Sequence, residues 1–461
     1  MAFDLTLTQA QHDLVARTHD FAENVVRPVA QHYDQQQEFP WPVLQEAARA
    51  GFYSPLFYRD LIGDPTGLSL PVFMEELFWG CAGIGLAVVM PALALSAIGQ
   101  AATPEQMLEW APQCFGTPDD IKLAALAISE PEGGSDVRNL RTTARQDGDD
   151  WVIDGHKMWI GNGGIADVHV VNANVDPELG HKGQALFIVP GGTKGLELVR
   201  KLDKLGCRAS HTAELKFDGV RIPKANLLGG ADKLEHKLAK AREAEKTGIR
   251  GRSATLGALE QTRPMVAAQA LGIARASLEY ATQYANEREA FGSPIIDNQG
   301  IAFPLADLAM RIDAARLLTW RASWMAANKI HFERGEGSMS KLAATEVAVA
   351  ATERAIQTMG GWGYITDHPV EKWYRDAKLY TIFEGTSEIQ RVVISNAIAQ
   401  KDGDVPLHAE MEPDGGPLNK AFGRGTETRT KMMNKAMEAK DKVPEPVLRG
   451  AMKLLQPPSR K

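Results

Sequence analysis

The sequence predicts an α+β fold in three parts: a helical domain, an antiparallel sheet or barrel, and a second helical domain. Apolar residues recur every three or four positions in the outer parts and every two in the middle. The chain has 461 residues, more than one compact core usually covers. We divide it into residues 1–119, 120–230 and 260–401, with a charged insertion at 231–259 and a tail at 402–461.

The first part carries a helical pattern from its beginning. Residues 7–34 and 40–51 place apolar side chains at spacings of three and four. Thr8 precedes the first of these segments and suits a helix cap, and Gly51 follows the second and suits a helix stop. Residues 1–119 are therefore predicted to be helical.

The middle part alternates instead. Between Thr212 and Ile222, the apolar residues Ala213, Leu215 and Phe217 alternate with polar ones. Other short apolar runs are bounded by Asp-Gly and Gly-Gly pairs, which are typical of turns between antiparallel strands. Residues 120–230 are predicted to form β-structure.

Helical spacing returns in the last part, after a stretch rich in Lys, Glu and Ala. That stretch, residues 231–259, shows no apolar stripe, so we expect an exposed or mobile insertion. One predicted helix carries a continuous face of Leu305, Leu308, Ile312, Ala315 and Thr319. Such a face indicates a helix packed in a bundle. The tail at 402–461 is rich in Pro, Gly and charge and is expected to be disordered, or helical only when docked.

Composition argues against several classes of function. A net charge of −7 disfavours general nucleic-acid binding. Cys81, Cys114 and Cys207 form neither a CxxC pair nor a cluster with histidines, so we expect buried or surface thiols rather than a disulfide frame or zinc site. The nucleotide and zinc motifs GxGxxG, GxxxxGK[ST] and HExxH do not occur in their required contexts. We expect no signal peptide and no membrane span, and hence a cytoplasmic protein.

Residues 380–391, YTIFEGTSEIQR, hold the first candidate for chemistry. Ser387 followed by Gln390 is a capping-box pattern, so a helix is predicted to begin at Ser387. Glu384 then lies on the preceding turn, where Gly385 permits the turn and the close approach of a ligand. The carboxylate is either a positioned base or a charge that complements the helix N-terminus.

Three other segments suit a polar or aromatic ligand. The loop AISEPEGGSD offers the hydroxyls of Ser129 and Ser135 beside a Gly pair, and is otherwise an ordinary turn. Trp159 in KMWIGN is either a flat surface for an aromatic cofactor or a core residue. Arg263 and Arg288, near the two ends of a predicted helix, either hold a phosphate or polar amide or form exposed salt bridges.

The order and spacing of these segments resemble the acyl-CoA dehydrogenase family over about residues 7–400, closest to its medium-chain and short-chain members. The matching segments are AISEPEGGSD, WVIDGHKMWIGN, QTRPMVAAQALGIARA, YANEREAFGSPI, QTMGGWGYITDHPVEKWYRDAKL and IFEGTSEIQR. The resemblance implies an N-terminal helical domain, a middle antiparallel β-barrel and a C-terminal four-helix bundle, with FAD between the last two. It also implies a FAD site shared between subunits, and so either a homo-oligomer (a dimer of dimers) or a hetero-oligomer with a related subunit.

By position, the resemblance gives Glu384 as the catalytic base. The positions that match FAD contacts are Leu126, Ile128, Ser129, Ser135, Trp159, Gly161, Arg288, Phe291, Gln299, Gln357, Gly360, Gly361, Thr386 and Glu388. Of these, the neighbouring subunit is expected to contribute Arg288, Phe291, Gln299, Gln357, Gly360 and Gly361. The positions that match acyl-CoA contacts are Ser135, Glu260, Arg263 and Gly385. No metal is implied.

The implied reaction is the α,β-dehydrogenation of an acyl-CoA thioester. Glu384 would take the α-proton while the β-hydrogen leaves as hydride to flavin N5, which gives a trans-2-enoyl-CoA; the electrons then pass to an electron-transferring flavoprotein. The Glu384 N–H and a ribityl hydroxyl of FAD would bind the thioester oxygen as an oxyanion hole. The sequence departs from the family at Gly161 and Ala290, where hydroxyl residues are common near FAD. We hypothesise that Gly161 alters the potential or position of the flavin.

Two other functions are compatible with the sequence. An acyl-CoA oxidase would run the same chemistry and return electrons to oxygen, although oxidases usually carry a further helical domain. A flavoprotein of this fold with a nucleic-acid-binding or structural role would be a different class, and the retained Glu384 and Arg288 speak against it. The length and branching of the acyl chain stay open: residues 85–97 line its end or belong to the core.

Overall fold

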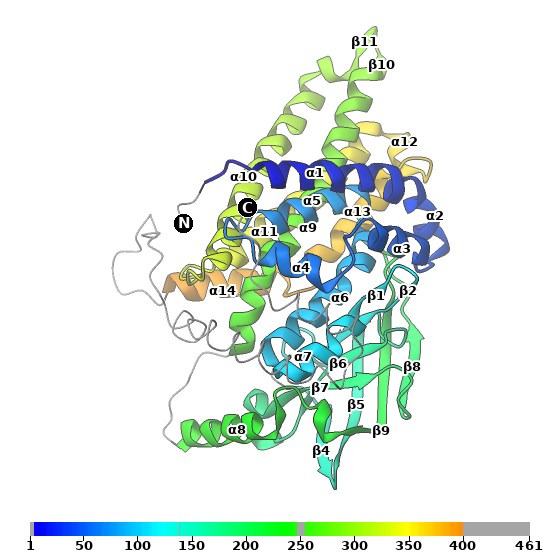
Figure 1. The fold of residues 1–461 in the computed structure, drawn as a ribbon. Helices are drawn as coiled ribbons and strands as arrows, with labels where there is room; N and C mark the ends of the chain where they lie inside the picture. The colour runs from blue at the N-terminus through cyan, green and yellow to red at the C-terminus, as the bar shows by residue number, and fades with distance from the viewer. Residues whose placement is uncertain (1–3, 138, 247–253, 400–461) are drawn as a thin grey trace.

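The computed structural model describes residues 4–137, 139–246 and 254–399 (Figure 1). The predicted α+β architecture is confirmed. Helices from the first and last parts of the chain pack together, and a curled sheet built from the middle part lies at one end of them. The predicted tail at 402–461 lies outside the described residues.

The N-terminal part is a group of helices joined by short turns. Their bounds are α1 Gln9–Phe21, a π-helix Ala22–Val26, a 3-10 turn Arg27–Val29, α2 Ala30–Gln36, α3 Trp41–Arg49, α4 Pro55–Ile62, α5 Ser69–Gly80, α6 Ala82–Ala101 and α7 Pro104–Trp110. Thr8 caps α1 in a capping box with Gln11, as predicted. Gly51, with φ 82°, follows the end of α3 as predicted.

The middle part forms a curled seven-stranded sheet. Its strands are β3 Ala124–Ala127, β4 Thr143–Asp147, β5 Asp150–Gly161, β6 Val168–Asn174, β7 Gln184–Pro190, β8 Leu196–Lys201 and β9 Thr212–Pro223, preceded by a small hairpin of β1 Gly116–Thr117 and β2 Asp120–Ile121. The alternation predicted for β9 is confirmed, since Ala213, Leu215 and Phe217 are buried. The expected purely antiparallel pairing is wrong in one respect, because β6 runs parallel to β3 and β4. Residue alternation reports which face is buried and carries no information about strand direction.

The C-terminal part is a bundle of long helices. Its elements are α8 Gly230–Lys246, α9 Ala254–Glu287, β10 Glu289–Ala290, β11 Ser293–Pro294, α10 Gln299–Ala327, α11 Glu336–Met359, α12 Gly361–Tyr364, α13 Val370–Tyr380 and α14 Ser387–Ala399. Helices α9 and α11 pack against each other, and both pack against α10 and α13, which confirms the predicted bundle. The face predicted for α10 is buried throughout: Leu305, Leu308, Ile312, Ala315 and Thr319.

The charged stretch after β9 departs from the expectation that it lacks an apolar stripe. Residues up to Lys246 form α8, in which Leu234 and Ala241 are buried and Leu238 packs against the core. Arg242 adds an ion pair with Asp176 at 2.8 Å. Three apolar residues at spacings of four and three suffice to dock one face, since long Lys and Arg stems cover the remainder.

An ion-pair network holds the first and last parts of the chain together. Glu75 and Glu76 on α5 are buried and face two arginines of the bundle. Arg275 on α9 lies 2.5 Å from Glu76 and 3.2 Å from Glu75, and Arg316 on α10 lies 2.8 Å from Glu75. Buried charges paired in this way cost a great deal to separate, so the N-terminal helices are fixed against α9 and α10.

Helix α6 corrects the expectation that no segment is long and apolar enough to span a membrane. Among the described residues, α6 alone passes that test. However, 61% of its most apolar window is buried in the fold, where it packs on β3 and β6. The interpretation as a core helix is therefore favoured over a membrane segment. Residues 85–89 of α6 are buried, while Met90 is half-buried. Cys81, Cys114 and Cys207 are buried free thiols, in line with one of the two expectations.

Candidate active site

Glu384 lies on a strained turn between α13 and α14. Its φ is 54°, in the left-handed region, and Gly385 follows with φ 89°. A residue with a β-carbon pays about 1–2 kcal/mol for this conformation, whereas glycine adopts it freely. Such strain persists only where the surroundings impose it, and it is common at functional positions. The turn predicted for Glu384 and Gly385 is confirmed.

Helix α14 begins at Ser387 as predicted, but its cap is different. The hydroxyl of Thr386, rather than that of Ser387, accepts the Ile389 N–H at 3.2 Å. Gln390 does not complete a capping box. Its side-chain amide donates to the carbonyls of Gly385 (2.7 Å) and Glu384 (3.3 Å) instead. The N-cap residue lies one position earlier in the chain than the pattern suggested. Ser387 is already the first residue of the helix, so Thr386 is the residue that flanks it.

The carboxyl group of Glu384 is withdrawn from solvent without a full set of hydrogen-bond partners. Its Oε2 atom is buried and has no hydrogen-bond partner within the described part of the chain, although the residue as a whole is half-buried. Burial raises the pKa of Glu384, against the opposing influence of the Lys341 and Arg263 cations. A carboxylate that merely complements a helix N-terminus would show a lowered pKa. Glu388, in the first turn of α14, behaves in that way: hydrogen bonds to its own backbone N–H and to Thr386 lower its pKa.

Two buried side chains from neighbouring helices fix the Glu384 turn. Lys341 of α11 donates to the carbonyls of Phe383 (2.8 Å) and Gly385 (2.6 Å). Gln390 of α14 holds the carbonyls of Glu384 and Gly385, as described above. Arg263 is buried in α9, where it donates to Ser338 at 2.5 Å. The interpretation of Arg263 as an exposed salt-bridge residue is therefore wrong.

Trp159 projects from a bulge in β5. The four residues of β5 from Lys157 to Ile160 lie opposite only three residues of β9, Ala213 to Leu215, so one residue is extra. Trp159 at this point has φ 60° and is 54% exposed, and Gly134 of the preceding loop lies against its ring. The interpretation of Trp159 as a core residue is wrong. An exposed indole on a strained strand position is a flat surface for an aromatic ligand.

A buried ion pair ties the loop after β3 to the Trp159 strand. Lys157 donates to Glu130 (2.9 Å) and to the carbonyl of Ile128 (2.9 Å). Glu130 also accepts the backbone N–H groups of Arg141 (2.6 Å) and Thr142 (2.9 Å). Burial raises the pKa of Glu130, but the Lys157 ammonium and these hydrogen bonds outweigh it and lower that pKa overall. The loop that carries Ser129 and Ser135 is thereby fixed at both ends.

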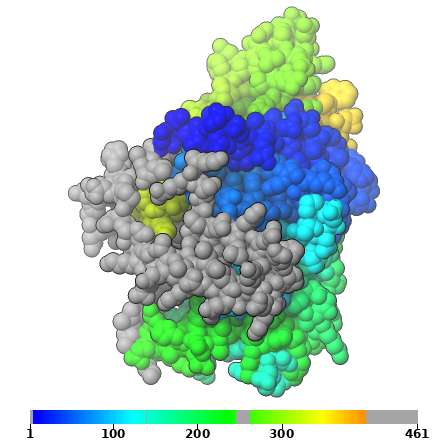
Figure 2. Space-filling model, viewed as in Figure 1, coloured from blue at the N-terminus to red at the C-terminus, as the bar shows by residue number. Residues whose placement is uncertain are grey.

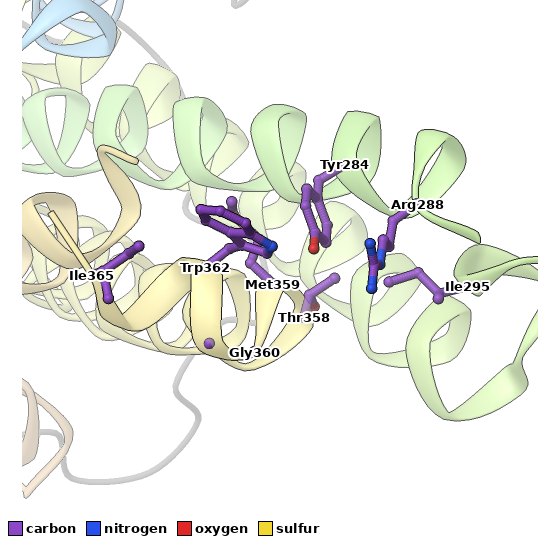
Figure 3. A pocket seen from close by; sticks show the side chains of 9 residues that line it. Tyr284, Arg288, Ile295, Thr358, Met359, Gly360, Trp362 and Ile365 are labelled. Atoms are coloured by element: carbon purple, nitrogen blue, oxygen red, sulfur yellow. The ribbon is translucent and has the colours of Figure 1, made fainter. Parts of the chain in front are cut away.

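Arg288 belongs to a separate hollow at the far end of the bundle. The hollow has a volume of about 480 Å³. Tyr284 and Arg288 project into it from α9 and its end, facing Thr358 and Trp362 (Figure 3). Gly360 and Gly361 complete the wall, and no side chain comes near the position of a β-carbon on either. A guanidinium beside open backbone suits a phosphate group.

The hairpin beyond Arg288 ends in an exposed aromatic ring. Phe291 and Gly292 form the two-residue turn between β10 and β11, with φ values of 55° and 92°. Positive φ at both positions is the pattern of a type I′ turn. Phe291 is fully exposed, and this end of the molecule extends beyond the N-terminal helices (Figure 2).

The predicted site residues thus fall into three groups. Leu126, Ile128, Ser129, Ser135, Trp159 and Gly161 lie on β3, β5 and the loop between β3 and β4. Glu384, Gly385, Thr386, Glu388 and Arg263 lie around the turn before α14. Arg288, Gly360 and Gly361 share the far hollow, with Phe291, Gln299 and Gln357 exposed on the same part of the bundle. Glu260 falls in α9, but its side chain lies outside the described part of the chain.

Sequence reasoning missed Lys341. A signal was present, since Lys341 precedes Ala344, Ala348 and Ala351 at spacings of three and four on an apolar face. A lysine on such a face requires a partner for its charge. Met90 packs so closely on Gly161 that a β-carbon there would lie 2.8 Å from its thioether. This contact was also missed, and no local pattern could have shown it, because the two residues lie on different domains.

Comparisons with known proteins identify relatives of this chain. Three family models match the chain. They are the acyl-CoA dehydrogenase N-terminal domain at residues 8–116, the middle domain at 125–220 and the C-terminal domain at 250–399. The mitochondrial short-chain specific acyl-CoA dehydrogenase of Rattus norvegicus is 41% identical over 387 residues, 83% of this chain and 89% of the relative.

Two solved structures share the fold. Butyryl-CoA dehydrogenase from Megasphaera elsdenii superposes with a TM-score of 0.74 and 31% identity, covering 86% of this chain and all of that one. A glutaryl-CoA dehydrogenase from Mycobacterium smegmatis, in complex with FADH2, superposes with a TM-score of 0.72 and 27% identity. The match covers 86% of this chain and 96% of that one. Identity and coverage at this level show common descent along most of the chain. The protein belongs to the acyl-CoA dehydrogenase family and is an oxidoreductase.

Proposed function

We propose that this protein dehydrogenates an acyl-CoA thioester to a trans-2-enoyl-CoA, with Glu384 as the base that removes the α-proton. The observation that carries the proposal is the Glu384 carboxyl group, whose Oε2 atom is buried without a hydrogen-bond partner in the described residues, on a strained turn. General-base catalysis is most efficient when the pKa of the base approaches the working pH, and burial shifts the pKa of Glu384 in that direction.

The residues near Trp159 suit a flat cofactor. Trp159 offers an exposed ring, Gly134 beside it has no side chain, and Ser129 and Ser135 add hydroxyls on a loop fixed by Lys157. We assign the flavin ring of FAD to this group, with Leu126, Ile128 and Gly161 alongside. When bound, FAD supplies the acceptor for the hydride of the β-carbon.

The group around Arg288 is too distant to serve the same cofactor within one chain. Arg263 and Glu287 are both in α9, 24 residues apart, which corresponds to roughly 36 Å along the helix. The Trp159 domain and the Arg288 hairpin also lie at opposite ends of the molecule (Figure 1). We therefore propose that Arg288, Gly360 and Gly361 hold the phosphate and adenosine end of FAD in a neighbouring subunit. This arrangement requires an oligomer.

Acyl-CoA and an electron-transferring flavoprotein are the proposed partners. Thr386, Glu388 and Gly385 lie beside the proposed base, and Arg263 reaches within 3.7 Å of the position a Gly385 β-carbon would take. The short-chain specificity named for the rat relative favours a short acyl group, so a C4 thioester is expected to react fastest in a panel. Reoxidation by electron-transferring flavoprotein rather than by oxygen would separate the dehydrogenase from an acyl-CoA oxidase.

The test is an anaerobic titration of the FAD-loaded protein with acyl-CoAs of increasing length, with flavin absorbance as the signal. The wild-type protein should bleach, while Glu384→Gln should bind acyl-CoA and stay yellow. Glu197→Gln is the control, because it removes an exposed carboxylate on β8 that belongs to none of the three groups of site residues. Bleaching of Glu384→Gln at the wild-type rate would exclude Glu384 as the base.

A further inference from the structure

Lys341 is a fully buried lysine whose partners are backbone carbonyls. Its exposed fraction is 0%, and it forms no ion pair with a carboxylate in the described part of the chain. Lysine is almost never buried in this way without a specific partner. Here the ammonium donates to the carbonyls of Phe383 at 2.8 Å and Gly385 at 2.6 Å. These carbonyls belong to the residues on either side of Glu384.

The bond to Phe383 has a geometric consequence for Glu384. The Phe383 carbonyl and the Glu384 N–H belong to one planar peptide unit, and no peptide in the described chain is cis. In a trans unit the two groups point in opposite directions. Lys341 therefore directs the Glu384 N–H away from itself. This N–H has no acceptor in the described part of the chain, so it is a free donor next to a carboxyl oxygen that also lacks a partner.

The charge of Lys341 acts on the same carboxyl group. Burial raises the pKa of Glu384, while Lys341 and Arg263 lower it in opposition. Burial also lowers the pKa of Lys341, to about 8. The Arg263 cation lowers this pKa further, whereas the carboxylates of Glu384 and Glu388 raise it. The charged groups that face Lys341 are thus Arg263 on α9, Glu388 on α14 and Glu384 itself. Lys341 favours the ionised form of Glu384, which is the form a base requires.

We propose that Lys341 is a positioning residue of the dehydrogenation, which fixes the Phe383–Glu384 peptide unit and holds the Glu384 carboxylate ready to accept a proton. The inference rests on the proposed role of Glu384. It extends that role by assigning the orientation of the base to a side chain of α11, 43 positions earlier in the chain. Because Lys341 has no exposed surface, the proposed role is exercised through Glu384.

The test compares Lys341→Met, which keeps the length of the side chain and removes the charge, with Lys341→Arg, which keeps the charge and displaces the donor. Ser340→Ala is the control, because Ser340 is equally buried on the same helix, and within the described residues its hydroxyl donates only to the Gly337 carbonyl of that helix. FAD content and apparent Tm are measured first. Acyl-CoA affinity and the rate of anaerobic flavin reduction are then measured across pH.

Lys341→Met should bind acyl-CoA with little change and reduce its flavin about 10²- to 10³-fold more slowly, the usual cost of losing one oriented donor. The acid limb of its pH–rate profile should move to higher pH, because Glu384 loses a cation that lowers its pKa. The infrared titration of the Glu384 carboxyl, isolated by subtracting Glu384→Gln, should shift in the same direction without turnover. Lys341→Arg should be slow as well, but with the acid limb at its wild-type position.

A Lys341→Met protein that loads FAD and keeps both the wild-type rate and the wild-type acid limb would overturn the proposal. If this variant does not load FAD, the rate of Lys341→Arg decides the question, and a wild-type rate of flavin reduction in that variant would overturn the proposal. The role of Glu384 and the role of Lys341 are contradicted by different results. Rapid bleaching of Glu384→Gln would remove the proposed function, whereas an inactive Glu384→Gln with an unaffected Lys341→Met would remove only the role of Lys341.

Discussion

The side chain of Met90, on α6, occupies the space directly above Gly161 at the end of β5. A β-carbon added to Gly161 would lie 2.8 Å from both the Sδ and the Cε atoms of Met90. The site at which we hypothesised a missing hydroxyl is therefore filled by a thioether from another domain. Because methionine is flexible, the two residues form an adjustable contact rather than a rigid one.

Met90 and Gly161 should consequently be coupled energetically. Gly161→Ser forces Met90 to move, at a cost in the range of about 1–3 kcal/mol for an overpacked site. In the Met90→Ala background the same substitution should cost less, with a coupling of about 1 kcal/mol in a double-mutant cycle. Urea unfolding of the four proteins measures this coupling. Additive effects would show that the contact does not constrain Gly161.

The hypothesis on the flavin potential is best tested in that background. Gly161→Thr combined with Met90→Ala supplies a hydroxyl and the room to place it. We expect the reduction potential of bound FAD to differ from that of Met90→Ala alone, as judged by spectroelectrochemical titration. An equal potential in the two proteins would show that residue 161 does not act on the flavin.

Ionisation of Glu384 should destabilise the folded protein, whereas ionisation of Glu388 should stabilise it. Because burial raises the pKa of folded Glu384, the stability it contributes is present below its unfolded pKa of about 4.3 and is lost as the pH rises through the folded value. Glu384→Gln resembles the protonated form, so its apparent Tm at neutral pH should exceed that of the wild type by about 1–3 °C. The difference should disappear below about pH 4.

Glu388 is the matched control for this titration. Its pKa is lowered in the folded protein, so its contribution is present above the unfolded pKa and is lost as the pH falls through the folded value. Glu388→Gln should therefore lower the apparent Tm at neutral pH and change it little in acid. Equal shifts of both variants at neutral pH would contradict the assigned environments.

The Lys157–Glu130 pair should be costly to break from one side. Lys157→Met leaves Glu130 as an unpaired buried carboxylate, a change that typically destabilises by about 3–5 kcal/mol. Because the pair fixes the loop that carries Ser129, we also expect weaker retention of FAD during gel filtration. Lys216→Met, which removes a surface partner of Asp218, is the control and should alter neither property.

How far the sequence predicts this protein depends on the range of each interaction. Thr8, the α10 face beginning at Leu305 and the start of α14 follow from spacings of a few residues, and all are found as predicted. The cap at Thr386 was misplaced by one residue, because the Ser and Thr hydroxyls compete for the same backbone group. The parallel pairing of β3 and β6 lies beyond any local pattern.

The candidate site likewise combines features that short segments predict with features that depend on tertiary contacts. Family segments locate Glu384 and Trp159, but their left-handed backbones depend on what holds them. Glu384 is held by Lys341 from another helix, and Trp159 depends on a register shift against β9. A residue that acts through tertiary contacts carries no motif of its own, which is why Lys341 and Met90 were not predicted.

The proposed sharing of FAD between subunits can be tested by complementation. Glu384→Gln lacks the base and Arg288→Ala lacks the proposed phosphate contact, so each protein alone should be inactive at limiting FAD. In a mixed assembly, one site combines the intact Glu384 of one chain with the intact Arg288 of the other. Random pairing should then restore about a quarter of the wild-type activity, since half of the pairs are mixed and each holds one intact site. If both residues served the same site within one chain, every site would keep a defect and mixing would restore nothing.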